Sequence, residues 1–299
     1  MNEIENHSLI KKYYRVAELN FCVELEARDL YALRSFESFE IAPTSDIIIH
    51  LKPSQKLEEK EVEHQLENSD ESGYSRCTRF KDGTFRLETT FEKGNPIITC
   101  IQANDDFSCV EYRLRKNVIL RQIGLASAVH IAFPLAAVKH GVLAIHASAV
   151  LYGDRAYAFT AVSGTGKSTH TSLWIKNIDG ATLLNDDNPI IRVIDGKPYL
   201  FGSPWSGKTP CYKNTHARLG AITIVKRAKE NKVNRLDPVE SFMTIQNNVN
   251  NIRFEHDIDT FVCDSIQAIV ETTPCYELYC LPNDDAAKVC FESLVLNNK

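Results

Sequence analysis

The sequence lacks several features that mark specialised classes of protein. No run approaches the roughly 18 apolar residues that cross a membrane, and the opening residues MNEIENHSLIKKYY lack the charged and then apolar layout of a signal peptide. Basic residues are not in excess, since 34 lysines and arginines stand against 39 aspartates and glutamates. We therefore expect a cytoplasmic protein with neither a membrane nor a nucleic acid as its partner.

Cysteine pairs at metal-binding or redox spacing are also missing. The nine cysteines are scattered, their number is odd and no C-x-x-C occurs. Most of them lie in apolar or alternating stretches, where a free thiol behaves as a small core residue. This pattern predicts free thiols in a reducing compartment rather than disulfides or zinc ligands.

Glycine is scarce, with 13 residues in 299, so the stretch AVSGTGKSTH at residues 161–170 stands out. The phosphate-loop pattern G-x-x-x-x-G-K-[ST] requires a glycine where this chain has Ala161, whereas Gly166, Lys167 and Ser168 fit. Alanine is harmless at that position if its φ angle is negative. The stretch is either a working nucleotide site with one tolerated substitution or a coincidence.

The pattern of residues predicts an α/β fold with mixed sheets, in two parts. Residues 1–115 are β-rich, with short alternating runs such as FCVELEA and TFRLETTFE. Within them, the acidic segment 56–75 is expected to be a solvated loop or a surface helix. Residues 116–299 begin with a buried helix at 117–140, interrupted near Pro134.

The loop has the sequence context of a phosphate-binding site. We expect a strand at 142–151, a turn at Gly153 and Asp154, a second strand at 155–161, and a helix directly after the loop. The segment after that helix reads as a strand carrying two aspartates, followed later by a helix from Asp237 to about Asn247. A strand over CYELYC and a final amphipathic helix complete the second part.

Such a loop binds phosphate through backbone N–H groups, its lysine and the following helix. The expected ligands are ATP, bound through the loop, and Mg²⁺, held by Ser168. The residues predicted to bind the nucleotide are Ser163, Gly164, Thr165, Gly166, Lys167, Ser168 and Thr169.

Two acids and a histidine are the candidate catalytic partners. Asp186 and Asp187 follow an apolar run, 19 and 20 residues beyond Lys167. One of them can hold Mg²⁺, for which we choose Asp187 with Ser168, and the other can accept a proton from a hydroxyl. The alternative is an ordinary turn with two aspartates. His146 lies in an apolar strand, where a histidine is more often a core residue than a catalytic one.

These motifs together resemble the catalytic domain of HPr kinase/phosphorylase and its structural relative, ATP-dependent phosphoenolpyruvate carboxykinase. The similarity covers residues 140–190, with His146, Lys167, Ser168 and the Asp186–Asp187 pair at the family's motif positions. It implies that a P-loop catalytic domain follows the β-rich N-terminal region in the sequence and that His146 has a functional role. Related stand-alone members phosphorylate a serine of a small peptide.

The sequence also departs from that family. Thr169 stands where the bifunctional enzyme has glutamate, and no RGLG-like segment is present. Removal of phosphate from a phosphoserine and HPr itself as substrate are therefore not expected. The chain is far too short for a carboxykinase, which makes decarboxylation the least favoured activity.

The segment FGSPWSGKTP at residues 201–210 contains a second Ser-Gly-Lys-Thr. Pro204 and the missing glycine argue against a second nucleotide site. We expect either an exposed turn or a loop that lines the acceptor pocket, with Lys208 stabilising transferred charge and Trp205 forming a wall. Lys226 and Arg227 are further candidate cations.

The sequence therefore predicts an ATP-dependent kinase whose acceptor is the hydroxyl of a peptide, a protein or a small molecule. Its predicted catalytic residues are Asp186, Asp187, His146, Lys167 and Lys208. The alternative is a nucleotide-binding regulatory or scaffold protein without turnover. A homo-oligomer is compatible with either function.

Overall fold

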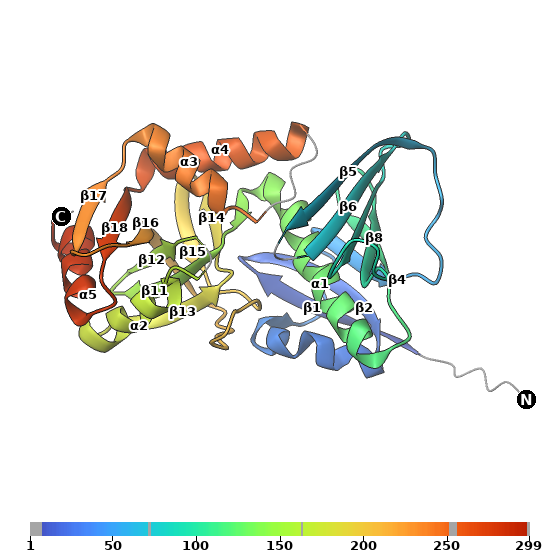
Figure 1. Cartoon of the computed structure of the whole chain (residues 1–299). Helices are drawn as coiled ribbons and strands as arrows, with labels where there is room; N and C mark the ends of the chain where they lie inside the picture. The colour runs from blue at the N-terminus through green and yellow to red at the C-terminus, as the bar shows by residue number, and fades with distance from the viewer. Residues whose placement is uncertain (1–7, 71–72, 163, 251–255, 298–299) are drawn as a thin grey trace, which may run out of the picture. The chain divides into compact units, whose positions relative to one another are not determined.

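The computed structural model describes residues 8–70, 73–162, 164–250 and 256–297. The chain forms two compact units, residues 1–137 and 138–299, each built around a nine-stranded sheet (Figure 1). The predicted α/β fold with mixed sheets is confirmed at this level. The units divide after residue 137 rather than after 115, because the helix that follows residue 117 packs on the sheet of unit 1.

Unit 1 has the strand order β3-β1-β2-β4-β9-β8-β7-β6-β5. Its strands are β1 (Leu9–Val16), β2 (Leu19–Glu26), β3 (Glu40–Ile41), β4 (Ile49–Pro53), β5 (Val62–Asp70), β6 (Gly73–Phe80), β7 (Phe85–Thr90), β8 (Thr99–Ala103) and β9 (Cys109–Arg113). Its helices are the 3₁₀ segment η1 (Ala27–Phe39) and α1 (Val118–Ala137). The expectation that 56–75 is a loop or helix was wrong, because edge strand β5 and the start of β6 occupy much of it.

One face of the unit 1 sheet forms its core with η1 and α1. Tyr14, Phe21, Phe36 and Phe133 pack their rings together with centroids 5.1 to 6.2 Å apart. The guanidinium of Arg121 donates to both carboxylate oxygens of Asp29, at 2.6 and 2.7 Å, and so ties α1 to η1. Burial of large aromatic rings supplies most of the stabilisation of such a core.

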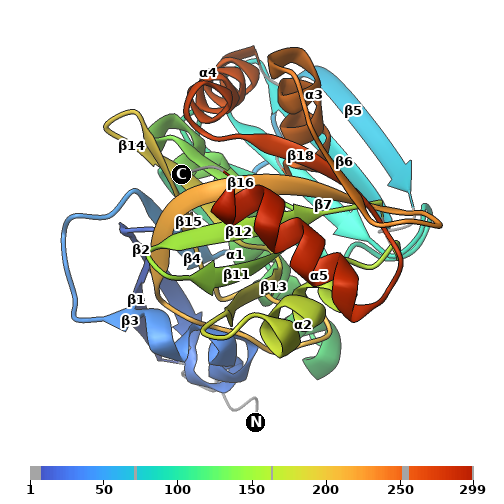
Figure 2. The same cartoon turned by 90° about the vertical axis from the view of Figure 1, so that its left-hand side faces the viewer.

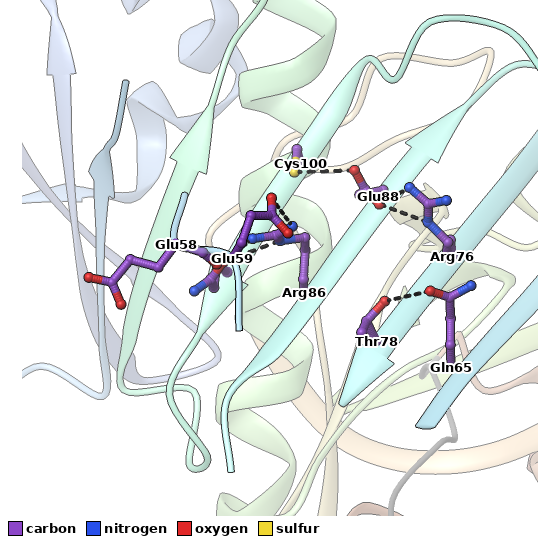
Figure 3. Close-up of polar contacts among 9 residues, drawn as sticks. Glu58, Glu59, Gln65, Arg76, Thr78, Arg86, Glu88 and Cys100 are labelled. Carbon is purple, nitrogen blue, oxygen red and sulfur yellow. Dashed lines mark hydrogen bonds and ion pairs between the residues drawn. The ribbon is translucent and has the colours of Figure 1, made fainter. Parts of the chain in front are cut away.

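Side chains that alternate with the core residues form pairs on the other face (Figure 3). Arg76 donates to Glu88 at 2.8 Å, and the thiol of Cys100 lies 3.8 Å from the same carboxylate. Arg86 donates to Glu59, in the loop between β4 and β5, at 2.9 Å. Arg76 and Arg86 on this face therefore each have a carboxylate partner.

Helix α1 continues through Pro134, contrary to the interruption predicted there. Pro134 is buried, and tertiary packing of the helix offsets the intrahelical hydrogen bond that proline cannot make. Among the described residues, Val118–His140 is the one helical stretch long and apolar enough to cross a membrane, which the sequence reading had not anticipated. Here α1 packs against η1 and β8 as a core helix.

In unit 2, β16 pairs with β12, β15 and β18, and the path β10-β14-β15-β16-β12-β11-β13 forms most of the sheet. The strands are β10 (Val142–Ala144), β11 (Ala147–Tyr152), β12 (Arg155–Thr160), β13 (Thr182–Asp187), β14 (Ile190–Ile194), β15 (Lys197–Phe201), β16 (His216–Arg227), β17 (Lys232–Arg235) and β18 (Cys275–Cys280). The helices are η2 (Val138–His140), α2 (Lys167–Asn177), α3 (Pro238–Asn248), α4 (His256–Thr272), α5 (Asp284–Phe291) and the π-helical turn η3 (Glu292–Leu296).

Helices α2 and α5 cover one face of the unit 2 sheet (Figure 2). Trp174 of α2 is fully buried against Phe159 of β12, with ring centroids 5.2 Å apart, and Cys290 of α5 belongs to the same cluster. Strands β12, β16 and β18 run parallel, so their carboxyl ends meet at one edge of the sheet. In α/β sheets this edge is where ligands bind.

The sequence missed one long helix and placed another correctly. Four apolar residues of α4 are buried at helical spacing: Ile258, Val262, Ile266 and Ile269. This spacing is visible in the sequence, but no helix was predicted from it. Helix α3 begins after Asp237, as predicted. The side chain of Asp237 also accepts from the backbone of Glu240 in a capping box. All nine cysteines are free, which confirms the prediction of unpaired thiols.

Candidate functional site

The phosphate-loop sequence joins the end of β12 to the start of α2. Gly164 and Gly166 have φ angles of 73° and 129°, which only glycine adopts without strain. Ala161 is buried and is not among the described residues with positive φ, so alanine fits there. The substitution that obscured the motif is thus compatible with a working loop. Ser163, also predicted to bind the nucleotide, lies outside the described residues.

A cation from the neighbouring strand holds the loop in place. Arg227, the last residue of β16, donates from Nε to the carbonyl of Thr165 at 3.1 Å and from Nη2 to that of Gly164 at 2.7 Å. Lys226 is turned to β18, where it pairs with Glu277. Both candidate cations therefore contact other residues of unit 2, and Arg227 supports the loop backbone.

The loop lysine belongs to a three-residue chain that ends on an acid. Lys167 Nζ lies 2.6 Å from His146 Nε2, and His146 Nδ1 lies 3.2 Å from Asp187 Oδ1. An ammonium group only donates, so His146 Nε2 accepts from it and the ring proton is on Nδ1, facing the carboxylate. Burial and the charge of Lys167 lower the pKa of His146, which favours this neutral form. Burial also lowers the pKa of Lys167.

His146 faces the site because the predicted strand 142–151 is broken at that point. Strand β10 ends at Ala144 and β11 begins at Ala147. Between them, Ile145 bridges to Val249 and the amide of His146 donates to the carbonyl of Asn248 at 2.8 Å. A continuous strand would have kept the side chain in a regular alternation, and the break leaves it beside Lys167.

The two aspartates make different contacts. Asp186 is buried, and its Oδ1 accepts from the hydroxyl of Ser168 at 2.7 Å. Asp187 is half-buried and contacts His146 instead. Ser168 therefore lies with Asp186 rather than with Asp187, the residue that sequence reasoning had grouped with it as a metal ligand.

The loop at residues 201–210, which contains Lys208, folds against Asp186 and Asp187. Ser206 Oγ and the amide of Gly207 donate to the carbonyl of Asp186, at 3.0 and 2.5 Å. A Cβ atom on Gly207 would lie 2.9 Å from the Cβ of Asp187, so a larger residue would force this part of the site to shift. Lys208 itself is exposed, and its ammonium makes no hydrogen bond or ion pair with any residue that the structure describes.

A buried asparagine anchors this loop. Asn185 has no exposed surface, and its amide donates to the carbonyl of Trp205 at 2.9 Å and to the hydroxyl of Ser203 at 3.2 Å. Its Oδ1 accepts from the backbone of Asn188 at 2.9 Å. Asn185, which the sequence reading did not single out, thus ties this loop to the strand that carries the two acids.

Asp187 is held in a costly backbone conformation. Its φ angle is 109°, and a side chain in that region costs about 1–3 kcal/mol. Asn188 Nδ2 donates to its Oδ2 at 2.8 Å, and Asn250 Nδ2 donates to Asn188 Oδ1 at 3.0 Å. Both carboxylate oxygens therefore have a partner. Strain of this kind concentrates where function requires a fixed side chain.

The side-chain oxygens at this site suit a metal ion that also binds the phosphates of a ligand. Among the described residues, no group of three or more His, Cys, Asp or Glu side chains could hold a metal ion by itself. Ser168 and Asp186 nonetheless offer two adjacent oxygens, the type of ligand that Mg²⁺ prefers beside substrate phosphates.

Comparison with known proteins adds no assignment. No protein-family model matches this sequence, and a search of curated proteins finds no significant match. The resemblance to HPr kinase/phosphorylase accordingly rests on the motif residues alone.

Proposed function

We propose that unit 2 is an ATP-dependent phosphotransferase that moves the γ-phosphoryl group of ATP to a hydroxyl. The observation that carries the proposal is the chain from Lys167 through His146 to Asp187, beside the pair formed by Ser168 and Asp186. A lysine, a neutral histidine and two acids thus converge on the start of a helix that follows a glycine loop.

The contacts support separate roles for the two acids. Asp187 is the base: it takes the proton of the acceptor hydroxyl as that oxygen bonds to the γ-phosphorus and the bond to the β-phosphate oxygen breaks. The products are the phosphorylated acceptor and ADP. His146 orients the base through Nδ1 and keeps Lys167 near the phosphates. Positioning and charge stabilisation supply most of the rate in such transfers.

Ser168 and Asp186 are the residues that would hold Mg²⁺ with the phosphates. The bound ion would neutralise negative charge on the β- and γ-phosphate oxygens. We assign the metal to this pair rather than to Asp187, because Ser168 Oγ contacts Asp186. The carboxylate of Asp187 then stays available for proton transfer.

The acceptor class follows from the resemblance and is a peptide serine or a small alcohol. A transfer assay with [γ-³²P]ATP and Mg²⁺ tests this on the full chain, using serine peptides and small hydroxyl compounds as acceptors. Lys167→Ala should reduce labelling at least about 1,000-fold. Lys176→Ala is the matched control, since Lys176 lies on the same helix but pairs with Asp284.

Label that survives Lys167→Ala, or that is lost equally in Lys176→Ala, would overturn the proposal. ATP binding with neither transfer to an acceptor nor hydrolysis would also overturn it, in favour of a nucleotide-binding regulator.

A further inference from the structure

Unit 1 has two adjacent cavities beside the segment that joins β9 to α1. One has a volume of about 510 Å³ and the other a volume of about 730 Å³. Arg113, Leu114 and Lys116 line both of them, so the two cavities lie against the same segment. We call the pair the β9–α1 groove. Cavities of this size accommodate the side chains of a ligand.

The groove is basic, although the whole chain is acidic. The sequence RLRKNVILR at residues 113–121 has four cations and no acid, in a chain of net charge −5. Arg113, Arg115 and Lys116 are exposed and form no ion pair with any residue that the structure describes. The guanidinium of Arg115 donates to the carbonyl of Ile97, which holds this side chain at the smaller cavity.

The acid that lines the groove does not balance these charges. Within the described part of the chain, Glu26 is the one acidic residue among those that line the two cavities. Its carboxylate already has two partners, because Arg28 lies 2.8 Å from Oε2 and Arg121 lies 2.7 Å from Oε1. The positive charge of the other three cations is therefore left for a ligand.

This arrangement differs from the rest of unit 1, where cations pair with nearby carboxylates. Lys52 lies 3.1 Å from Glu111, and Lys60 lies 2.7 Å from Asp82. Three unpaired cations within four residues repel one another, and that repulsion is relieved when anionic groups bind between them. The cluster therefore indicates a binding surface for several negative charges.

Apolar side chains accompany the cations. Leu120 lines the smaller cavity, and Leu9 lines the larger one with 49% of its surface exposed. Val118 and Ile119, which follow the cations in the sequence, are each 68% exposed. A small anion would contact the cations alone, and a flat bilayer would leave the cavities unfilled. An extended peptide with acidic and apolar side chains fits both features of the groove.

We propose that the β9–α1 groove binds an acidic segment of a peptide acceptor, separate from the serine that receives the phosphoryl group. Acidic side chains of the peptide pair with Arg113, Arg115 and Lys116, and its apolar side chains fill the cavities. This inference rests on the proposed function for the identity of the peptide. Docking of one segment raises the effective concentration of the serine at unit 2 of the same chain.

Fluorescence anisotropy of the full chain with a labelled peptide of repeated Glu-Glu-Leu-Gly units tests the binding without ATP. Arg113→Gln combined with Lys116→Gln should weaken binding at least about tenfold. Arg34→Gln combined with Lys197→Gln is the matched control and should have little effect. It removes the same charge from two exposed cations that line neither cavity.

Two measurements on the wild-type protein need no variant that must fold. A peptide with glutamine in place of each glutamate should bind at least about tenfold more weakly, because it lacks the negative charges. Binding of the glutamate peptide should also weaken in 1 M NaCl, which screens the interaction between exposed charges.

The transfer assay connects the groove to the reaction. A serine peptide that carries the acidic segment should have a KM at least about fivefold lower than the same peptide with glutamine in that segment. Arg113→Gln with Lys116→Gln should remove this difference and leave kcat unchanged, since these residues take no part in the chemical step.

The absence of peptide binding, equal binding of the glutamate and glutamine peptides, or equal effects of the two double variants would each overturn the inference. So would binding of inorganic phosphate, or of phosphatidylcholine vesicles with about one-third phosphatidylserine, that depends on Arg113 and Lys116 while the peptide does not bind. Peptide binding without phosphoryl transfer would remove the kinase and leave the groove. Transfer with a KM that the acidic segment does not change would remove the groove and leave the kinase.

Discussion

Unit 1 and the phosphate-loop region of unit 2 treat charged side chains in opposite ways. On unit 1, ion pairs shift the pKa of charged side chains in the direction that stabilises the charged form. Glu67 raises the pKa of Lys93, Glu88 raises the pKa of Arg76, and Lys60 lowers the pKa of Asp82. Exposed ion pairs of this kind contribute little to stability, and each charge already has a partner.

At the loop, burial disfavours the charged forms of two basic side chains. It lowers the pKa of both Lys167 and His146, although two carboxylates lie close by. Unit 2 also has ordinary pairs away from the loop, such as Lys226 with Glu277. Groups whose pKa is shifted by burial are concentrated at functional sites. The cause and direction of the pKa shifts therefore distinguish the loop region from unit 1 better than the number of charged residues does.

Beside the loss expected for Lys167→Ala, the largest effect expected near the loop is from Asp187→Asn. The amide keeps the shape of the side chain and tolerates positive φ, but it cannot take a proton. We expect phosphoryl transfer to fall about 1,000-fold, equivalent to about 4 kcal/mol in the barrier, with ATP affinity nearly unchanged. Steady-state kinetics and calorimetry measure the two quantities. A loss smaller than tenfold would contradict the role of Asp187 as base.

The second prediction concerns the pH dependence of stability. Burial lowers the pKa of His170 to about 4 from an ordinary 6.5, so the unfolded chain binds this proton more readily. Its stabilising contribution is therefore complete above pH 6.5 and is lost as the pH falls towards 4, by roughly 3 kcal/mol.

Urea denaturation of wild type and His170→Phe between pH 7 and 4 isolates this effect, because every other titrating group is common to both proteins. The wild type should lose roughly 3 kcal/mol more than the variant over this range. Parallel losses would show that His170 is protonated in the folded state.

A smaller effect is expected from the asparagine pair behind the base. Asn250→Ala removes the partner of Asn188 and loosens its hold on Asp187. We predict a roughly tenfold lower kcat with an unchanged KM for ATP, about 1.4 kcal/mol. The double variant with Asn188→Ala should lose little more than Asn188→Ala alone, since the two act in series. Additive losses would show that they act independently.

The sequence identified the loop residues and acids because their chemistry is local. A glycine loop after a strand and before a helix can be read from neighbouring letters, and the structure has that local order. The contact of His146 with Lys167 spans 21 residues and was not predicted, because the family resemblance implied only a functional role for His146. Its physical cause, a strand broken by pairing with Val249, depends on a segment a hundred residues away.

The parts that sequence reasoning missed depend on tertiary contacts. Asn185 precedes the acid pair directly, yet its role follows from a loop that folds back 18 to 26 residues later. Strand β5 was missed because it is an edge strand whose polar, acidic side chains resemble those of a loop. Pairing with β6, which no local pattern reveals, makes it a strand.

The smallest effect should come from unit 1 itself, through Glu88→Gln. Arg76 is about one-third exposed and keeps water as an alternative partner, so loss of this ion pair should cost about 1 kcal/mol or less of unfolding free energy. Salt screens such pairs, so the difference from wild type should shrink in 1 M NaCl. Phosphoryl transfer should stay within twofold of wild type. A tenfold loss of transfer would show that this face takes part in the reaction. The distinction between the ion pairs of unit 1 and the loop region of unit 2 would then be wrong.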